Sequence, residues 1–235
     1  QSHRAAGDST RADASLRRAI DVGDGPTKTS ARLTLGASLR AAGNAAGAID
    51  VLEAIDRSLL DAASAARTNY ELALAFIDAD DPRRASRLLD SVLESGASDL
   101  LPAAAYWRAK CDLRRSRFDD ASERLARLAE QYPKGELAVE TLYDLGYARQ
   151  RAGDTDGALR AFAMVRDRFA ERSIAEQALL AETSLVLGSG RQEAAIELAE
   201  PFLTRLSHSA RSADLRRTRA EARDAPGEAP PATNA

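Results

Sequence analysis

The feature that most constrains this sequence is an alanine that recurs along it at nearly constant intervals. Successive copies are separated by 36 or 37 residues, and they are Ala48, Ala85, Ala121, Ala158 and Ala195. Self-similarity with a period of roughly 20 to 50 residues is typical of a repeat array, in which each unit packs on its neighbours. We therefore expect a series of similar units and not one irregular core.

Each unit reads as two amphipathic helices joined by a short turn. In the clearest copy, Leu142 and Leu145 lie at helical spacing in a first helix, Gly153 marks the turn, and Phe162 lies in a second helix. Neither helix can bury its apolar face alone, so stacking of the units is required. The five predicted hairpins cover residues 28–57, 61–95, 100–132, 137–169 and 173–206.

The ends of the chain differ from the repeated part. We expect a disordered segment over residues 1–8, a helical array over 9–206 that opens with half a unit, and a polar capping helix within 207–224. Residues 225–235 are rich in proline and alanine and contain no large apolar side chain, which predicts a disordered tail.

Small residues recur in the first helices as well as in the second helices. We expect them where the two helices of a hairpin cross closely, because a larger side chain would force the helix axes apart. The first-helix positions are Gly36, Ala73, Ala109 and Gly146, and the larger residues that fill the space between hairpins include Leu52, Leu89, Leu125 and Phe162.

The unit resembles the tetratricopeptide repeat over roughly residues 28 to 203. The matching positions are Leu142, Leu145, Gly146, Ala158 and Phe162 in one copy and Ala121 and Pro133 in another. The resemblance implies an all-α fold, a right-handed α-superhelix (solenoid) of about five helical hairpins. Two departures are the longer period and Arg108, which stands where the family has leucine, so the packing of the third copy is an open question.

Residues 131–138 and 143–146 are similar to bacterial cell-envelope members of the family, such as the outer-membrane assembly lipoprotein BamD and the Tol-Pal coordinator CpoB. This similarity implies a periplasmic or outer-membrane-associated protein. Residues 105–110 resemble the superhelical region of lytic transglycosylases, although the chain has no room for the catalytic domain. A cytoplasmic adaptor is a third hypothesis. The sequence begins at Gln1, which leaves open whether a signal peptide, lipid anchor or further domain precedes it.

If the units stack as in the family, the first helices line a concave groove. One position of that surface holds Leu33, Tyr70, Tyr106 and Tyr143 in successive copies, and the predicted groove residues are Tyr70, Tyr106, Trp107, Lys110, Tyr143, Tyr147 and Arg151. Aromatic and basic side chains often anchor bound peptides or helices. We expect a protein or peptide segment as partner, and the alternative is that the tyrosines only pack between neighbouring first helices.

No pattern in the sequence predicts catalysis, a cofactor or a metal site. Cys111 is the only cysteine, and His3 and His208 lie at the two ends of the array. Asp154 begins a segment that lacks the glycine and closing glutamate of a calcium loop, so a helix cap is the better interpretation.

The net charge and hydropathy restrict the class of partner. A net charge of -3 and a pI of about 5.6 provide no general attraction for nucleic acid. No apolar run approaches the roughly 18 residues that a membrane span needs. Association of two copies of the chain remains open, because a terminal hairpin could also form a dimer face.

Overall fold

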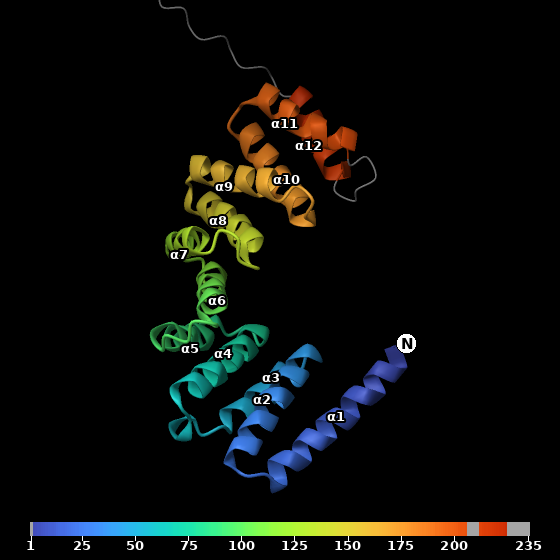
Figure 1. Ribbon diagram of the computed structural model, residues 1–235. Helices are drawn as coiled ribbons and strands as arrows, with labels where there is room; N and C mark the ends of the chain where they lie inside the picture. Colours follow the sequence, from blue (N-terminus) through green and yellow to red (C-terminus); the bar gives the residue numbers. More distant parts are fainter. Residues whose placement is uncertain (1, 206–211, 225–235) are drawn as a thin grey trace, which may run out of the picture. The chain divides into compact units, whose positions relative to one another are not determined.

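The computed structural model describes residues 2–205 and 212–224, and within these residues every regular element is helical (Figure 1). The predicted all-α, repeat-like fold class is confirmed. The helices are α1 (Ser2–Val22), α2 (Gly25–Ala41), α3 (Ala45–Glu53), the 3₁₀ helix η1 (Arg57–Leu59), α4 (Ala62–Asp78), α5 (Pro82–Glu94), α6 (Leu101–Arg114), α7 (Phe118–Gln131), α8 (Ala138–Ala152), α9 (Thr155–Arg168), α10 (Ser173–Gly188), α11 (Gln192–Arg205) and α12 (Ser212–Asp224).

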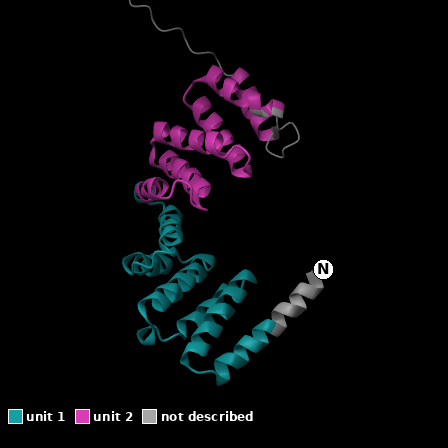
Figure 2. Ribbon diagram, viewed as in Figure 1, with its two compact units in different colours: residues 1–120 teal, residues 121–235 magenta. Residues whose placement is uncertain are grey.

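The chain forms two compact units, residues 1–120 and 121–235, and each is described by itself (Figure 2). In unit 1, α2 with α3 and α4 with α5 form hairpins, and α3 packs on α4 as α5 packs on α6. The first helices also contact one another, α2 with α4 and α4 with α6. We call this row of three helices the first-helix layer of unit 1.

Unit 2 repeats this arrangement. Here α8 with α9 and α10 with α11 form hairpins, and α9 packs on α10. Helix α12 packs on α11 and also contacts α10, so it continues the first-helix layer of this unit. Leu215, Thr218 and Ala222 of α12 are buried, whereas its arginines 219 and 223 both bind Glu200 of α11.

The two ends of the chain fall partly outside the described residues. Helix α1 begins at Ser2, whereas the sequence predicted a disordered segment over residues 1–8. No proline interrupts residues 2–22 and alanine is frequent there, and both features favour helix. The tail predicted to be disordered, residues 225–235, lies outside the described residues. Residues 206–211, which precede α12, also lie outside them.

The hairpin turns share one backbone feature that has the period of the repeat. In each turn one residue adopts a left-handed conformation: Gly43 (φ 77°), Asp80 (φ 57°), Ser116 (φ 57°), Gly153 (φ 88°) and Gly190 (φ 82°). Glycine reaches this conformation without steric cost, and other residues do not. The turn therefore recurs even where glycine has been replaced.

Close helix crossings occur where the small residues predicted them. A Cβ atom added to Gly36 would lie 2.7 Å from Cγ of Leu52, and one added to Gly146 would lie 2.6 Å from Cε1 of Phe162. Both contacts join the first and second helix of one hairpin. The predicted cap at Asp154 is also confirmed, since its carboxylate accepts a hydrogen bond from the backbone N–H of Gly157 at 2.9 Å.

Candidate partner-binding surface

The first-helix layer of unit 1 carries an aromatic pair that joins two repeats. Tyr70 on α4 and Trp107 on α6 are both half-buried and pack against the core of this unit. The indole N–H of Trp107 donates a hydrogen bond to the phenol oxygen of Tyr70. Burial raises the pKa of Tyr70, and the negative charge of Glu71 adds to this, while Trp107 and Arg40 oppose it.

Tyr106 supports this pair from within the unit. Its side chain is only 7% exposed, and its ring centroid lies 5.5 Å from that of Trp107 at an interplanar angle of 71°. Nζ of Lys110 lies 5.9 Å from the centroid of the Tyr106 ring, within the range of a cation–π contact. Tyr70, Tyr106, Trp107 and Lys110 thus form one group, which we call the α4–α6 cluster.

Charged side chains fix the helices that carry this cluster. Nε of Arg40 on α2 lies 2.7 Å from Oδ2 of Asp78, and its Nη1 lies 3.3 Å from Oε2 of Glu71, so one arginine links α2 to α4. Nη1 of Arg114 on α6 donates to the carbonyl oxygen of Ile77 near the end of α4 at 2.6 Å, in addition to the backbone N–H of Asp80 at 3.1 Å. These contacts hold the first-helix layer together from repeat to repeat.

Arg108, which replaces the leucine of the family pattern, is buried in an ion-pair network. Its side chain is 6% exposed, and its guanidinium contacts Asp112 on α6 at 2.6 Å and Asp90 on α5 at 2.7 Å. Asp112 is fully buried, and Arg117 lies 3.9 Å from it. The third copy therefore packs a neutralised charge pair where the family places an apolar side chain, which answers the question of how Arg108 is accommodated.

In unit 2, Tyr143 lies against its own hairpin. Its ring centroid is 5.6 Å from that of Phe162, at an interplanar angle of 57°, so a residue of α8 packs on one of α9. Phe162 is 1% exposed and belongs to the core. This contact lies within one hairpin, whereas the alternative expected from the sequence was packing between neighbouring first helices.

One exposed pair follows Tyr143 on α8. Nη1 of Arg151 donates to the phenol oxygen of Tyr147 at 2.8 Å, and the guanidinium carbon lies 5.7 Å from the centre of the tyrosine ring. Tyr147 is 36% exposed, which is unusual for a large apolar residue in the described chain. The predicted groove residues thus form two local groups, one in each unit, and a continuous ladder through both units stays a prediction.

The described residues contain no arrangement with recognisable catalytic chemistry. Burial raises the pKa of the Cys111 thiol to about 11, so the thiolate that a nucleophile requires is disfavoured. No group of three or more His, Cys, Asp or Glu side chains with metal-binding geometry occurs in residues 2–205 and 212–224. In the same part of the chain, no helix has both the length and the hydropathy of a membrane span.

Comparison of the sequence with protein families gives a match in two stretches. The tetratricopeptide repeat model matches residues 103–135 and 140–171, the third and fourth predicted hairpins. Over these two stretches the chain is similar to the tetratricopeptide repeat. The match does not distinguish among the functional types of the family, and no curated protein matches the sequence.

Solved structures support the same fold over most of the chain. The tetratricopeptide-like repeats of a putative kinesin light chain from Podosopora anserina share 18% identity, cover 85% of this chain and 99% of their own, and have a TM-score of 0.63. The apo form of RapI shares 18% identity over 92% of this chain and 70% of its own, at a TM-score of 0.65. MamA from Desulfovibrio magneticus RS-1 shares 16% identity, covers 81% of this chain and 96% of its own, and has a TM-score of 0.64. At such identities the likeness concerns the fold alone.

Sequence reasoning missed the contacts that join different repeats. It did not find the hydrogen bond between Trp107 and Tyr70 or the binding of Arg108 to Asp90, because the residues involved lie 37 and 18 positions apart. The left-handed turn residues Asp80 and Ser116 could have been found, since they stand 37 and 73 residues after Gly43.

Proposed function

We propose that the chain is a non-enzymatic scaffold that binds a segment of a partner protein along the first-helix layer of unit 1. The observation that carries the proposal is the Tyr70–Trp107 pair, which is held in place by a hydrogen bond and is still partly accessible. Aromatic side chains of this kind bury a large area at a small cost in conformational entropy, and they are enriched among residues that dominate binding energy.

The α4–α6 cluster also supplies the features that a peptide site needs besides apolar area. Lys110 adds a positive charge beside the rings, and the buried Tyr106 fixes Trp107 in one orientation. Because Arg40 and Arg114 lock the neighbouring helices to one another, the surface is formed before a partner arrives. A preformed surface loses less entropy on binding and so binds more tightly.

The proposal extends to the setting in which the scaffold works. We infer a bacterial envelope complex, in the periplasm or at the outer membrane, from the resemblance of residues 131–138 and 143–146 to cell-envelope members of the family. Fractionation of cells that produce the native protein tests this inference. Recovery in the periplasmic or outer-membrane fraction is expected, and recovery in the cytoplasm would favour the adaptor hypothesis.

Site-specific photocrosslinking in the native organism tests the binding surface itself. A photoreactive amino acid in place of Lys110 on α6 should crosslink to a partner protein, because it lies beside Trp107. The matched control is the same replacement at Arg87 on α5, an exposed residue of a second helix in the same unit. Equal crosslinking from both positions, or none from position 110, would overturn the proposal.

A further inference from the structure

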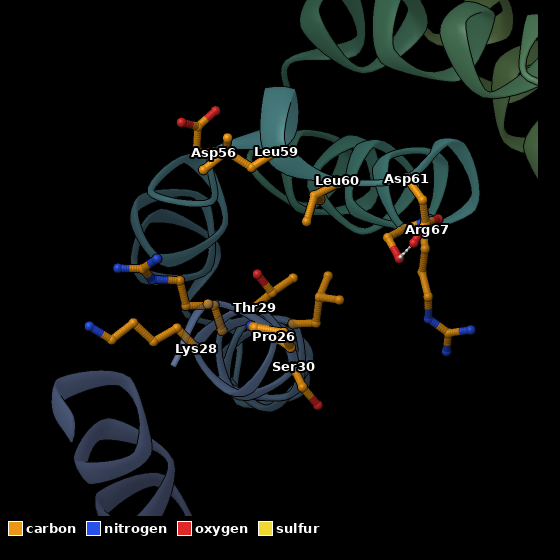
Figure 3. Close-up of a pocket in the computed structure, with 13 residues that line it drawn as sticks. Pro26, Lys28, Thr29, Ser30, Asp56, Leu59, Leu60, Asp61 and Arg67 are labelled. Carbon is orange, nitrogen blue, oxygen red and sulfur yellow. Dashed lines mark hydrogen bonds between the residues drawn. The ribbon is translucent and has the colours of Figure 1, made fainter. Parts of the chain in front are cut away.

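A second feature of unit 1 is a pocket of about 590 Å³ between the start of α2, the connection that contains η1, and the start of α4. Figure 3 shows Pro26 and Thr29 of α2 on one side of it and Leu59 and Leu60 of the connection on the other. We call it the connection pocket. Leu33, also part of its wall, stands at the repeat position that Tyr70 occupies in the next copy.

Part of the wall of the connection pocket is apolar, formed by Pro26, Leu33, Leu59 and Leu60. Leu59 is 82% exposed although it is a large aliphatic residue. Leu60 is partly buried against the core of the unit. Exposed apolar side chains that line a hollow mark a binding site more often than isolated ones do. One apolar side chain of a ligand would therefore gain contact area here.

Three basic side chains line the same pocket, and none of them forms an ion pair within the described part of the chain: Lys28, Arg32 and Arg67. Lys28 and Arg67 lie at opposite sides of the hollow (Figure 3). Other arginines of unit 1, such as Arg40, Arg108 and Arg117, are each paired with carboxylates. The pocket therefore gathers three basic side chains in one place.

The two carboxylates at the pocket are already engaged. Asp56 accepts hydrogen bonds from the backbone N–H and hydroxyl of Ser58, and its carboxylate points away from the hollow (Figure 3). Asp61 caps α4 by accepting from the backbone N–H and hydroxyl of Ser64. These hydrogen bonds lower the pKa of Asp56 and Asp61 still further below neutral pH. Both carboxylates are therefore charged, and the three cations and two anions of the lining leave a positive excess of one.

A hollow in unit 2 provides the contrast. It has a volume of about 470 Å³, and its charged lining is balanced, with Arg160 and Arg191 facing Glu182 and Glu197. Glu182 is in addition paired with Arg166 at 2.6 Å. The lining of this hollow therefore has no excess positive charge with which to bind an anion.

We propose that the connection pocket binds an acidic peptide segment that places one apolar side chain between α2 and the connection. The carboxylates of the segment pair with Lys28, Arg32 and Arg67, and the apolar side chain contacts Pro26, Leu59 and Leu60. The inference rests on the proposed function in one respect, that the occupant is a segment of a protein. It assigns the chemistry of that segment, which the α4–α6 cluster does not determine.

Labelled nine-residue peptides with a central leucine flanked by glutamate, by glutamine or by lysine test the charge of the ligand. Their affinities for the full chain are measured by fluorescence anisotropy at low and high salt. An exposed ion pair contributes a factor of up to about five in affinity, so the glutamate peptide should bind roughly tenfold more tightly than the glutamine peptide, and salt should reduce the difference. Equal affinities for the three peptides would overturn the proposal.

Charge reversal locates the interaction. The double variant Lys28→Glu, Arg67→Glu should reverse the preference and bind the lysine peptide more tightly than the glutamate peptide. Arg87→Glu on α5 changes an exposed arginine of the same unit outside the pocket and should leave the preference unchanged. A preference that survives the double variant, or one that Arg87→Glu shifts equally, would overturn the assignment to this pocket.

An apolar variant tests the remaining contact. Leu59→Ser should weaken the glutamate peptide about threefold to tenfold without loss of helical content, because Leu59 is already exposed. The matched control is Met164→Ser, which removes an apolar side chain that is 41% exposed in unit 2. Unchanged binding by the Leu59 variant would contradict the proposal.

Failure of this inference can be distinguished from failure of the proposed function. Trp107→Ala tests the α4–α6 cluster through capture of the crosslinked partner, whereas the pocket variants are read with synthetic peptides. Loss of partner capture in Trp107→Ala together with equal binding of all three peptides would leave the scaffold function standing and remove only the pocket.

Discussion

Tyr70 and Tyr143 occupy the same position of the repeat in different units, and their rings rest on different neighbours. Tyr70 is hydrogen-bonded to Trp107 on the following first helix, whereas Tyr143 lies against Phe162 within its own hairpin. The residue that corresponds to Phe162 in the hairpin of Tyr70 is Leu89, which offers no aromatic ring. The identity of one second-helix residue thus accompanies the difference between a tyrosine that contacts its own hairpin and one that contacts the following first helix.

The largest expected effect comes from removing the ring on which Tyr143 rests. Phe162→Ala should lower the free energy of unfolding by about 3–5 kcal/mol, because Phe162 is fully buried and Gly146 leaves no side chain to fill the cavity. Urea denaturation followed by circular dichroism measures this loss. A cost below about 1 kcal/mol would show that the contact between Tyr143 and Phe162 contributes little to unit 2.

A second pair of positions sharpens the comparison, since Arg108 in unit 1 corresponds to Leu145 in unit 2. Arg108→Leu should cost about 3 kcal/mol of unfolding free energy, because it leaves the carboxylate of the fully buried Asp112 without its main counter-ion. The double variant Arg108→Leu, Asp112→Leu should recover most of that loss, as Leu145 shows that leucine fits the repeat at the first of these positions. Equal stability of the single and double variants in urea would contradict this explanation.

The sequence was sufficient to predict the helical hairpins and much of their internal packing. The period, the turn residues and the small positions such as Gly36 and Gly146 are local properties, and each is repeated several times. The candidate site was predicted less well. Neighbouring residues of a helix point about 100° apart, so one position decides whether Tyr106 or Trp107 is buried, and periodicity locates a helical face only to that precision.

The sequence pattern does not predict the contacts between repeats, and the reason is physical. Asp90 neutralises Arg108 from another helix, and Leu59 lines a pocket because the connection between α3 and α4 folds as a short 3₁₀ helix. Neither residue is special in its own segment. Their roles depend on tertiary distances that the repeat spacing does not specify.

A smaller effect is expected from the hydroxyl that distinguishes Tyr70. Tyr70→Phe should reduce the free energy of unfolding by about 1 kcal/mol, the typical contribution of one hydrogen bond. Because burial raises the pKa of Tyr70 in the folded state, the unfolded state ionises first as the pH rises above about 10. The wild type should therefore lose stability through the alkaline range, and the variant should lack the part of this loss that Tyr70 causes.

Urea denaturation at several pH values above neutrality, read through the fluorescence of Trp107, measures this dependence in unit 1. Trp107 is the only tryptophan in the sequence, so the signal reports on the α4–α6 cluster. An identical alkaline dependence in wild type and variant would show that the Tyr70 hydroxyl is as well hydrated in the folded state as in the unfolded state.

The smallest effect concerns the turns, where the two units differ in residue type but share a conformation. Ser116 in unit 1 has φ 57° and Gly153 in unit 2 has φ 88°. Ser116→Gly should raise the free energy of unfolding by up to about 1 kcal/mol, because glycine removes the steric cost of the left-handed backbone. Asp80→Gly should gain less, since it also removes a carboxylate that lies 3.6 Å from Arg114. Gly153→Ser should lower the free energy of unfolding by about as much as Ser116→Gly raises it, if the backbone conformation of the turn alone decides the effect. Unequal changes would show that contacts with the flanking helices also determine which residue is favoured.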